Sequence, residues 1–355
     1  MVLGKVVYRR WCFSFVADVL ISLATAGVVL GRALSVGADS QSTSPADQKY
    51  LLIHAIKNSS LRDELTEAGV RGYGIEFAGN DRTGFGIILK HDDAGPRTYR
   101  FVDTMREGTF VSELNVAGSQ GFRLIFAKFS GISDVGALVQ QKDGKRFTYS
   151  VVSGADAGAK ALTESSKRGI ALAAVLGESI ILEEQLGAAE TLTSRQRDYR
   201  IVATIRDSTL EKELKQAAAE GFRAIAAGPS GESPIKTVVM ERDVGASQTA
   251  LEYKAISSAS ARNLEHQLQA AGAEGFRIAV SPMPKDEGLF VLHRTPSTSE
   301  RFEYRMARPE KLTVNDLMLA AEADGYRPVS FTSGFLVFER PITGTPRSED
   351  RLPTY

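Results

Sequence analysis

A glycine that recurs six times at nearly equal spacing is the feature that most constrains the fold of this chain. Successive copies are separated by 49, 48, 52, 54 and 50 residues. The copies are Gly72, Gly121, Gly169, Gly221, Gly275 and Gly325. A tyrosine precedes each glycine by 20 to 22 residues, at Tyr50, Tyr99, Tyr149, Tyr199, Tyr253 and Tyr304. Self-similarity at a fixed period indicates a repeat architecture, so the sequence predicts six tandem copies of one unit.

The segment before each glycine has the pattern of a short amphipathic helix. In the fourth copy, Leu210, Leu214 and Ala217 precede the glycine by eleven, seven and four residues and share one face of a helix. Only the third copy departs from this stripe, with Gly158 at the first position. The recurring glycine is typical of a helix end, where a left-handed residue has no Cβ penalty. Helix N-caps are predicted at Ser59 or Ser60, Thr109, and Ser208 or Thr209, with Asp207 or Thr313 as further candidates.

Apolar segments on both sides of the helix are predicted to be strands. The tyrosine opens a first strand, the glycine is followed by a second, and a turn-rich loop precedes a third. The fold class is therefore α+β, with six βαββ repeats of about fifty residues. The crossover helix makes strands one and two parallel, and strand three returns antiparallel, so mixed sheets with helices on one face are expected. The other face is expected to meet a neighbouring copy, so that the copies pack as pairs or as a quasi-symmetric array.

The repeat positions give the domain organisation. The third copy is the most degenerate, and a division of the chain into halves is expected there if one exists. The predicted segments are a signal peptide (1–38), a polar linker (39–48), repeats one to six (49–92, 98–143, 147–185, 197–243, 251–295 and 302–340) and a polar tail (341–355).

The first 38 residues have the pattern of an N-terminal export signal. Lys5, Arg9 and Arg10 form a basic start, an uncharged apolar run covers 19–31, and small residues end at Ala38. We therefore expect a periplasmic or secreted protein. The alternative is an uncleaved anchor, which is the one case in which a membrane contact is expected. The only cysteine, Cys12, lies inside this signal, so the mature chain has no disulfide, thiolate metal site or cysteine nucleophile.

The net charge of the mature chain gives no electric field that would attract a polyanion. Removal of residues 1–38 leaves 39 basic and 42 acidic residues, so no nucleic-acid partner is expected. The histidines, His54, His91, His266 and His293, have no ligand spacing between them. No metal, cofactor or catalytic constellation is predicted.

The motifs of the unit resemble a small bacterial domain of unknown function. They are a strand opening with tyrosine and a basic residue, a helix ending in an acid, glycine and an aromatic, and a last strand ending in arginine. Copies four to six match best, for example with Tyr253-Lys254, Glu274-Gly275-Phe276 and Arg294. Two departures are the lack of a tryptophan after the glycine in every copy and the loss of most of the pattern in the third copy. The resemblance implies the fold of the unit and no chemistry.

Two sets of cations recur at fixed places in the unit. The first set is the candidate ligand-binding site, for an anionic ligand: Arg123, Arg223, Arg277 and Arg327. The second set is Arg100, Arg200, Lys254 and Arg305. The competing interpretation is internal ion pairing with acids of the same unit, namely Glu220, Glu274 and Asp324 at helix ends and Glu241 and Glu339 on third strands.

The sequence favours a non-catalytic exported protein of the cell envelope that binds a protein partner or a ligand. Repeat arrays offer large surfaces for such binding. One alternative is an enzyme with its site at the centre of a quasi-symmetric array. Known enzymes with similar pseudo-symmetric propellers use a cysteine, which the mature chain lacks. A second alternative is a structural component of the envelope.

Overall fold

A computed structural model describes most of the chain from Gln48 to Ile342, in thirteen segments. The described residues are 48–55, 57–80, 85–104, 106–129, 134–176, 179–187, 196–228, 236–245, 250–258, 260–280, 288–308, 314–332 and 334–342. The predicted signal peptide, the linker except Gln48 and most of the polar tail lie outside these residues. The described segments belong to one compact unit that spans Thr43–Tyr355.

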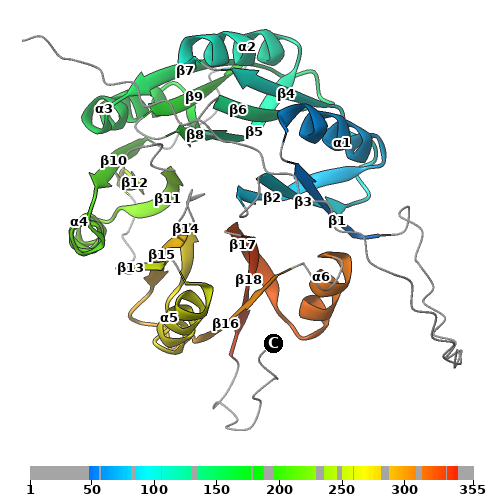
Figure 1. Ribbon diagram of the computed structural model, residues 1–355. Coiled ribbons are helices and arrows are strands. Elements are labelled where there is room, and N and C mark those ends of the chain that lie inside the picture. The colour runs from blue at the N-terminus through cyan, green and yellow to red at the C-terminus, as the bar shows by residue number, and fades with distance from the viewer. Residues whose placement is uncertain are drawn as a thin grey trace, which may run out of the picture. The chain divides into compact units, whose positions relative to one another are not determined.

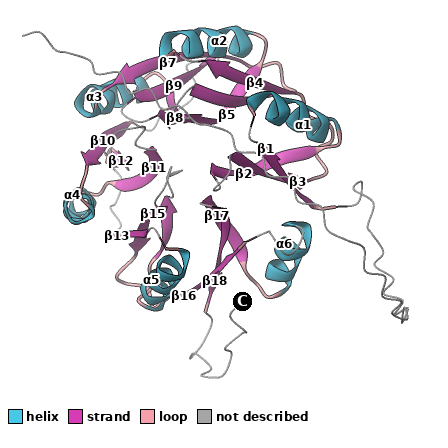
Figure 2. Cartoon of the chain, in the orientation of Figure 1, coloured by secondary structure: helices cyan, strands magenta, loops and turns pink. Residues whose placement is uncertain are grey.

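Each predicted repeat folds as strand, helix, strand, strand (Figure 2). The first strands are β1 (Tyr50–Ala55), β4 (Tyr99–Thr104), β7 (Arg146–Ser153), β10 (Arg197–Thr204), β13 (Glu252–Ser258) and β16 (Phe302–Ala307). The helices are α1 (Asn58–Val70), α2 (Glu107–Ser119), α3 (Ala155–Ser166), α4 (Asp207–Ala219), α5 (Ala261–Ala273) and α6 (Val314–Ala323). The second strands are β2 (Tyr73–Asn80), β5 (Phe122–Phe129), β8 (Ala171–Leu176), β11 (Arg223–Gly228), β14 (Arg277–Val280) and β17 (Arg327–Thr332). The third strands are β3 (Phe85–His91), β6 (Asp134–Gln140), β9 (Ser179–Leu186), β12 (Lys236–Asp243), β15 (Gly288–Arg294) and β18 (Phe335–Pro341). The α+β class and the six βαββ units are thus confirmed.

The helix stripe is buried as the sequence pattern requires. The residue seven before the glycine is fully buried in every unit, at Leu65, Leu114, Leu162, Leu214, Leu268 and Met318. All six recurring glycines have positive φ, between 76° and 91°, which confirms their place after the helix end. In unit three, a Cβ on Gly158 would lie 2.5 Å from Ile180 and 2.9 Å from Ile201. The larger neighbouring side chains fill this place, so the third unit keeps the fold despite its altered sequence.

The N-caps predicted for α1, α2 and α4 are wrong, including Asp207, which is the first residue of α4 and not its cap; the candidate Thr313 lies outside the described residues. Helices α1, α2 and α4 begin at Asn58, Glu107 and Asp207, and none has a side-chain cap hydrogen bond. Ser59, Thr109 and Ser208 therefore lie inside the first turn. The residues at the cap positions of these helices are Lys57, Arg106 and Arg206, in extended conformation.

Each unit forms its own three-stranded sheet with the third strand in the centre. The order in unit one is β1-β3-β2, and the other five sheets repeat it. Strands one and two run in the same direction, as the crossover requires, but each pairs only with strand three. Every hydrogen-bonded pair in the sheets is consequently antiparallel. The central strands are covered on both faces, and Ile87, Ile88 and Leu89 of β3 are fully buried.

The units pack in cyclic order. The helix of each unit packs on the first strand of the next, from α1 on β4 to α5 on β16, and α6 packs on β1. We call each such boundary a seam. One apolar cluster spans each seam, including the closing one, where Tyr50 and Ile88 join Met318 and Phe338. Figure 1 shows the helices outermost and the second strands innermost in this array. The described residues contain no helix long and apolar enough to cross a membrane.

Candidate functional site

A β-bulge interrupts each second strand at the same position. The ladder register shifts between Ile75 and Phe77 in β2 and between Leu124 and Phe126 in β5, and the other four second strands repeat this shift. The bulged residues are Glu76, Ile125, Ala173, Ile225, Ala279 and Val329. Bulges twist an edge strand and re-aim its side chains. Here they shape the strand edges that face the interior of the array.

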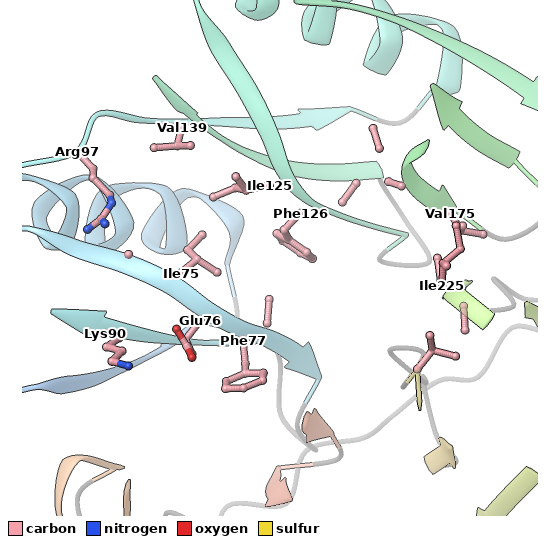
Figure 3. A pocket seen from close by; sticks show the side chains of 18 of the residues that line it. Ile75, Glu76, Phe77, Lys90, Arg97, Ile125, Phe126, Val139, Val175 and Ile225 are labelled. Atoms are coloured by element: carbon pink, nitrogen blue, oxygen red, sulfur yellow. The ribbon is translucent and has the colours of Figure 1, made fainter. Parts of the chain in front are cut away.

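A cavity of about 610 Å³ opens among these strands (Figure 3). Five consecutive residues of β2, from Gly74 to Ala78, form one wall. Lys90, Asp92 and Arg97 add charged groups beside it, and the lining residues from units two to five are apolar, with Ile125, Phe126, Val175 and Ile225 prominent. Second strands β5 and β8, β8 and β11, and β11 and β14 contact one another closely, whereas β2 and β5 stand further apart. The cavity therefore extends into the seam between units one and two.

At this seam, Gly74 stands where four other units have an arginine. Gly74 pairs with Lys90 in the ladder as Arg223 pairs with Glu241. The guanidinium of Arg97 fills the vacated space, because a Cβ on Gly74 would lie 3.1 Å from Cζ of Arg97. Arg97 donates to the Gly72 carbonyl at 2.7 Å and forms an ion pair with Asp92. The hydrogen bond that Arg97 donates to Asp92 holds the pKa of the Asp92 carboxyl below its usual range.

Two further residues of unit one depart from the repeat and line the same cavity. Lys90 occupies the ladder position opposite the recurring tyrosine, where other units have Val139, Glu183, Glu241, His293 and Glu339. Glu76 is the bulged residue of β2, where all other units have an aliphatic side chain. Neither Lys90 nor Glu76 forms an ion pair within 4 Å with another described residue. The Lys90 ammonium lies 5.8 Å from the centre of the Tyr50 ring.

The four predicted ligand-binding arginines lie in ion pairs and do not line the cavity. Arg223 bonds Glu241 of its own unit at 2.7 Å, and Arg327 bonds Glu339 at 2.6 Å. Arg123 instead bonds Glu183 at 2.9 Å, and Arg277 bonds Glu339 at 3.4 Å, in each case across the seam to the next unit. The internal pairing interpretation is confirmed for Arg223 and Arg327. A ligand role for the four arginines stays a prediction.

Buried glutamates anchor these ion pairs. Glu339 is 1% exposed and also accepts a hydrogen bond from the Tyr304 hydroxyl at 2.7 Å. Glu183 accepts from Tyr149 in the same way at 3.1 Å. Burial, together with the neighbouring carboxylate, raises the pKa of both tyrosines. The Tyr149 and Tyr304 hydroxyls also accept hydrogen bonds from the Leu124 and Ile278 amides, each in the unit before. The recurring tyrosine therefore joins the two units at each of these seams.

The other recurring polar residues are structural in the same sense. In the second cation set, Arg200, Lys254 and Arg305 pair with the predicted acids at the helix ends, and Arg100 bonds Gln120. The aromatic after the glycine is buried in units one, four, five and six. His293 is largely enclosed beside Tyr253, and burial lowers its pKa. The described residues contain no cluster of His, Cys, Asp and Glu that could hold a metal ion.

Reasoning from the repeat missed Gly74, Glu76, Lys90 and Arg97, because it sought residues that recur. A search for departures at repeat positions could have found the first three of them. Comparison with known proteins adds no assignment: no family model, no curated protein and no solved structure matches this chain.

Proposed function

We propose that this chain is an exported, non-catalytic binding protein whose ligand is a small molecule held in the cavity between β2 and β5. One observation carries the proposal: the residues of unit one that depart from the repeat gather on one cavity of about 610 Å³. A cavity of that size that combines apolar side chains with a few polar groups is typical of small-molecule sites. The recurring residues support the fold, so the departures are the better guide to function.

The proposal can be tested by identifying what the protein carries after purification. The full chain would be expressed in a bacterial host, recovered from the cell envelope or medium, and examined by native mass spectrometry before and after denaturation. We expect a bound small molecule with apolar character. In the variant Ile125→Asp, a carboxylate would stand on the cavity wall, and the ligand should be lost.

The matched control is Val116→Asp. Both residues belong to unit two, and both are exposed, Ile125 at 42% and Val116 at 48%, but Val116 lies on α2 away from the cavity lining. Retention of the ligand in both variants, or its loss in both, contradicts the proposed site.

Export is tested separately. Amino-terminal sequencing of the protein from the envelope fraction should begin close to Asp39, where the predicted signal ends. Recovery of the intact amino terminus in the membrane fraction would favour the uncleaved anchor. Recovery from the cytoplasm would contradict both forms of the export proposal.

A further inference from the structure

From the charges in the cavity we infer that its ligand is a zwitterion with an apolar body, of the α-amino-acid or short-peptide class. The inference rests on the proposed function and adds the chemistry of the ligand. Its basis is the pair Lys90 and Glu76, two opposite charges that line the same cavity without an ion-pair partner within 4 Å among the described residues.

The other charges near the cavity are already committed. Arg97 and Asp92 neutralise each other. Glu322 is held by Lys49 at 2.8 Å and accepts a hydrogen bond from the Tyr50 hydroxyl; it also attracts Lys90, but the two form no ion pair within 4 Å. A purely anionic ligand would meet Glu76, and a purely cationic one would meet Lys90. A head group that carries both charges satisfies both side chains.

The positions of the two residues favour a single head group between them. Lys90 is on β3 and pairs in register with Gly74, two residues before Glu76 on the neighbouring strand. Figure 3 shows both side chains on the same wall, beside Ile75 and Phe77. An α-ammonium would bind Glu76, and an α-carboxylate would bind Lys90. Gly74 has no side chain between them, and the Arg97 guanidinium, already paired with Asp92, lies beside it.

The rest of the cavity suits an apolar body. Phe77 and Ile75 lie next to the charged pair, and Ile125 and Phe126 face them from β5. The volume of about 610 Å³ exceeds that of one amino acid, so a short apolar peptide also fits. The bulge within β2 breaks the regular edge that an added strand would need, so recognition through the two charges is expected in place of strand pairing.

The test uses four probes with one apolar body and different head groups. L-Phenylalanine carries both charges, phenethylamine only the ammonium, 3-phenylpropanoate only the carboxylate, and 2-phenylethanol neither. Binding to the exported protein, freed of any endogenous ligand, would be measured by calorimetry. We expect L-phenylalanine to bind at least about tenfold more tightly than each of the others, because each charge-assisted hydrogen bond contributes about that factor.

Variants assign each charge to its side chain. Glu76→Gln should reduce L-phenylalanine binding to the level of 3-phenylpropanoate, and Lys90→Met to the level of phenethylamine. Glu64→Gln on α1 and Lys212→Met on α4 change the same charges on exposed helix faces outside the cavity and should leave binding unchanged. Urea midpoints close to that of the unmodified protein would show that the variants fold.

Three outcomes overturn the zwitterion: a probe with one charge or none that binds as tightly as L-phenylalanine, cavity variants that behave like their controls, or no binding of any probe. The proposed function fails on a different result: the endogenous ligand is then retained in both Ile125→Asp and Val116→Asp, or lost in both. A ligand displaced by Ile125→Asp but indifferent to Glu76 and Lys90 would leave the binding function standing and remove only the zwitterion.

Discussion

At the residue scale, three of the seams share one arrangement: an arginine lies on one side, and an aromatic residue or a glycine faces it from the other side. Arg123 lies over the Phe147 ring at 5.8 Å, and Arg277 lies over Phe302 at 5.4 Å. At the seam between units one and two the order is reversed, with Gly74 on one side and Arg97 on the other. Each of these seams thus holds one guanidinium against a carboxylate. The sequence alone could not give these partners, because Arg123 and Glu183 are sixty residues apart.

The stability of the seam between units five and six should depend more on the buried Glu339 than on the arginines that bond it. Glu339→Ala removes the partner of Tyr304, Arg277 and Arg327 at once, and we expect a loss of about 3 kcal/mol in the free energy of unfolding in urea. Arg327→Ala should cost less than about 1 kcal/mol, because that side chain is 56% exposed and Glu339 keeps Arg277. Equal losses in the two variants would contradict this assignment.

At the element scale, the sequence pattern predicts the helices and strands well and their order in the sheet poorly. The helix stripe, the glycine and the opening tyrosine all lie where the period places them. The central position of the third strand was not predicted, although a signal was present. Third strands carry unbroken apolar runs, such as Val238-Val239-Met240, which is typical of a strand covered on both faces. The N-caps failed because the helices begin two or three residues earlier than the hydroxyl pattern suggests.

The close approach of each helix to the next unit predicts a strong contrast between two glycines of α2. A Cβ on Gly118 would lie 2.3 Å from the Phe147 carbonyl oxygen, whereas nothing lies within 4 Å of one on Gly108. Gly118→Ala should therefore lower the free energy of unfolding by about 2 kcal/mol through overpacking. Gly108→Ala, in the same helix, should raise it by up to about 1 kcal/mol. Urea unfolding followed by circular dichroism measures both, and a neutral Gly118→Ala would show that α2 and β7 pack less closely.

At the scale of the whole molecule, closure of the array determines both the fold and the site. The first strand of each sheet is an edge, and helix side chains of the preceding unit cover it. Asn115 accepts a hydrogen bond from the Tyr149 amide at 2.6 Å. Asn315 accepts hydrogen bonds from the Lys49 and Tyr50 amides at 2.9 and 3.1 Å. Closure also brings residues of units one to five to one cavity. The cavity could not be predicted from a single unit, because no unit contains enough of its wall.

A closed array has no terminal unit, so its closing seam should be as important as an internal one. Asn315→Ala removes the acceptor for two backbone amides between units six and one, and Asn115→Ala removes three hydrogen bonds, to the Thr148 hydroxyl and to the Tyr149 amide and carbonyl, between units two and three. If the array is closed in solution, each variant should cost about 1–2 kcal/mol in a single cooperative urea transition.

In an open array the terminal units fray independently, and the nearest-neighbour energetics of linear repeats would then apply. Asn315→Ala would in that case change the main transition little while Asn115→Ala still lowered it, and that asymmetry would contradict closure. Equal losses would show that the six units stabilise one another around the complete cycle, with the cavity as part of a cooperative structure.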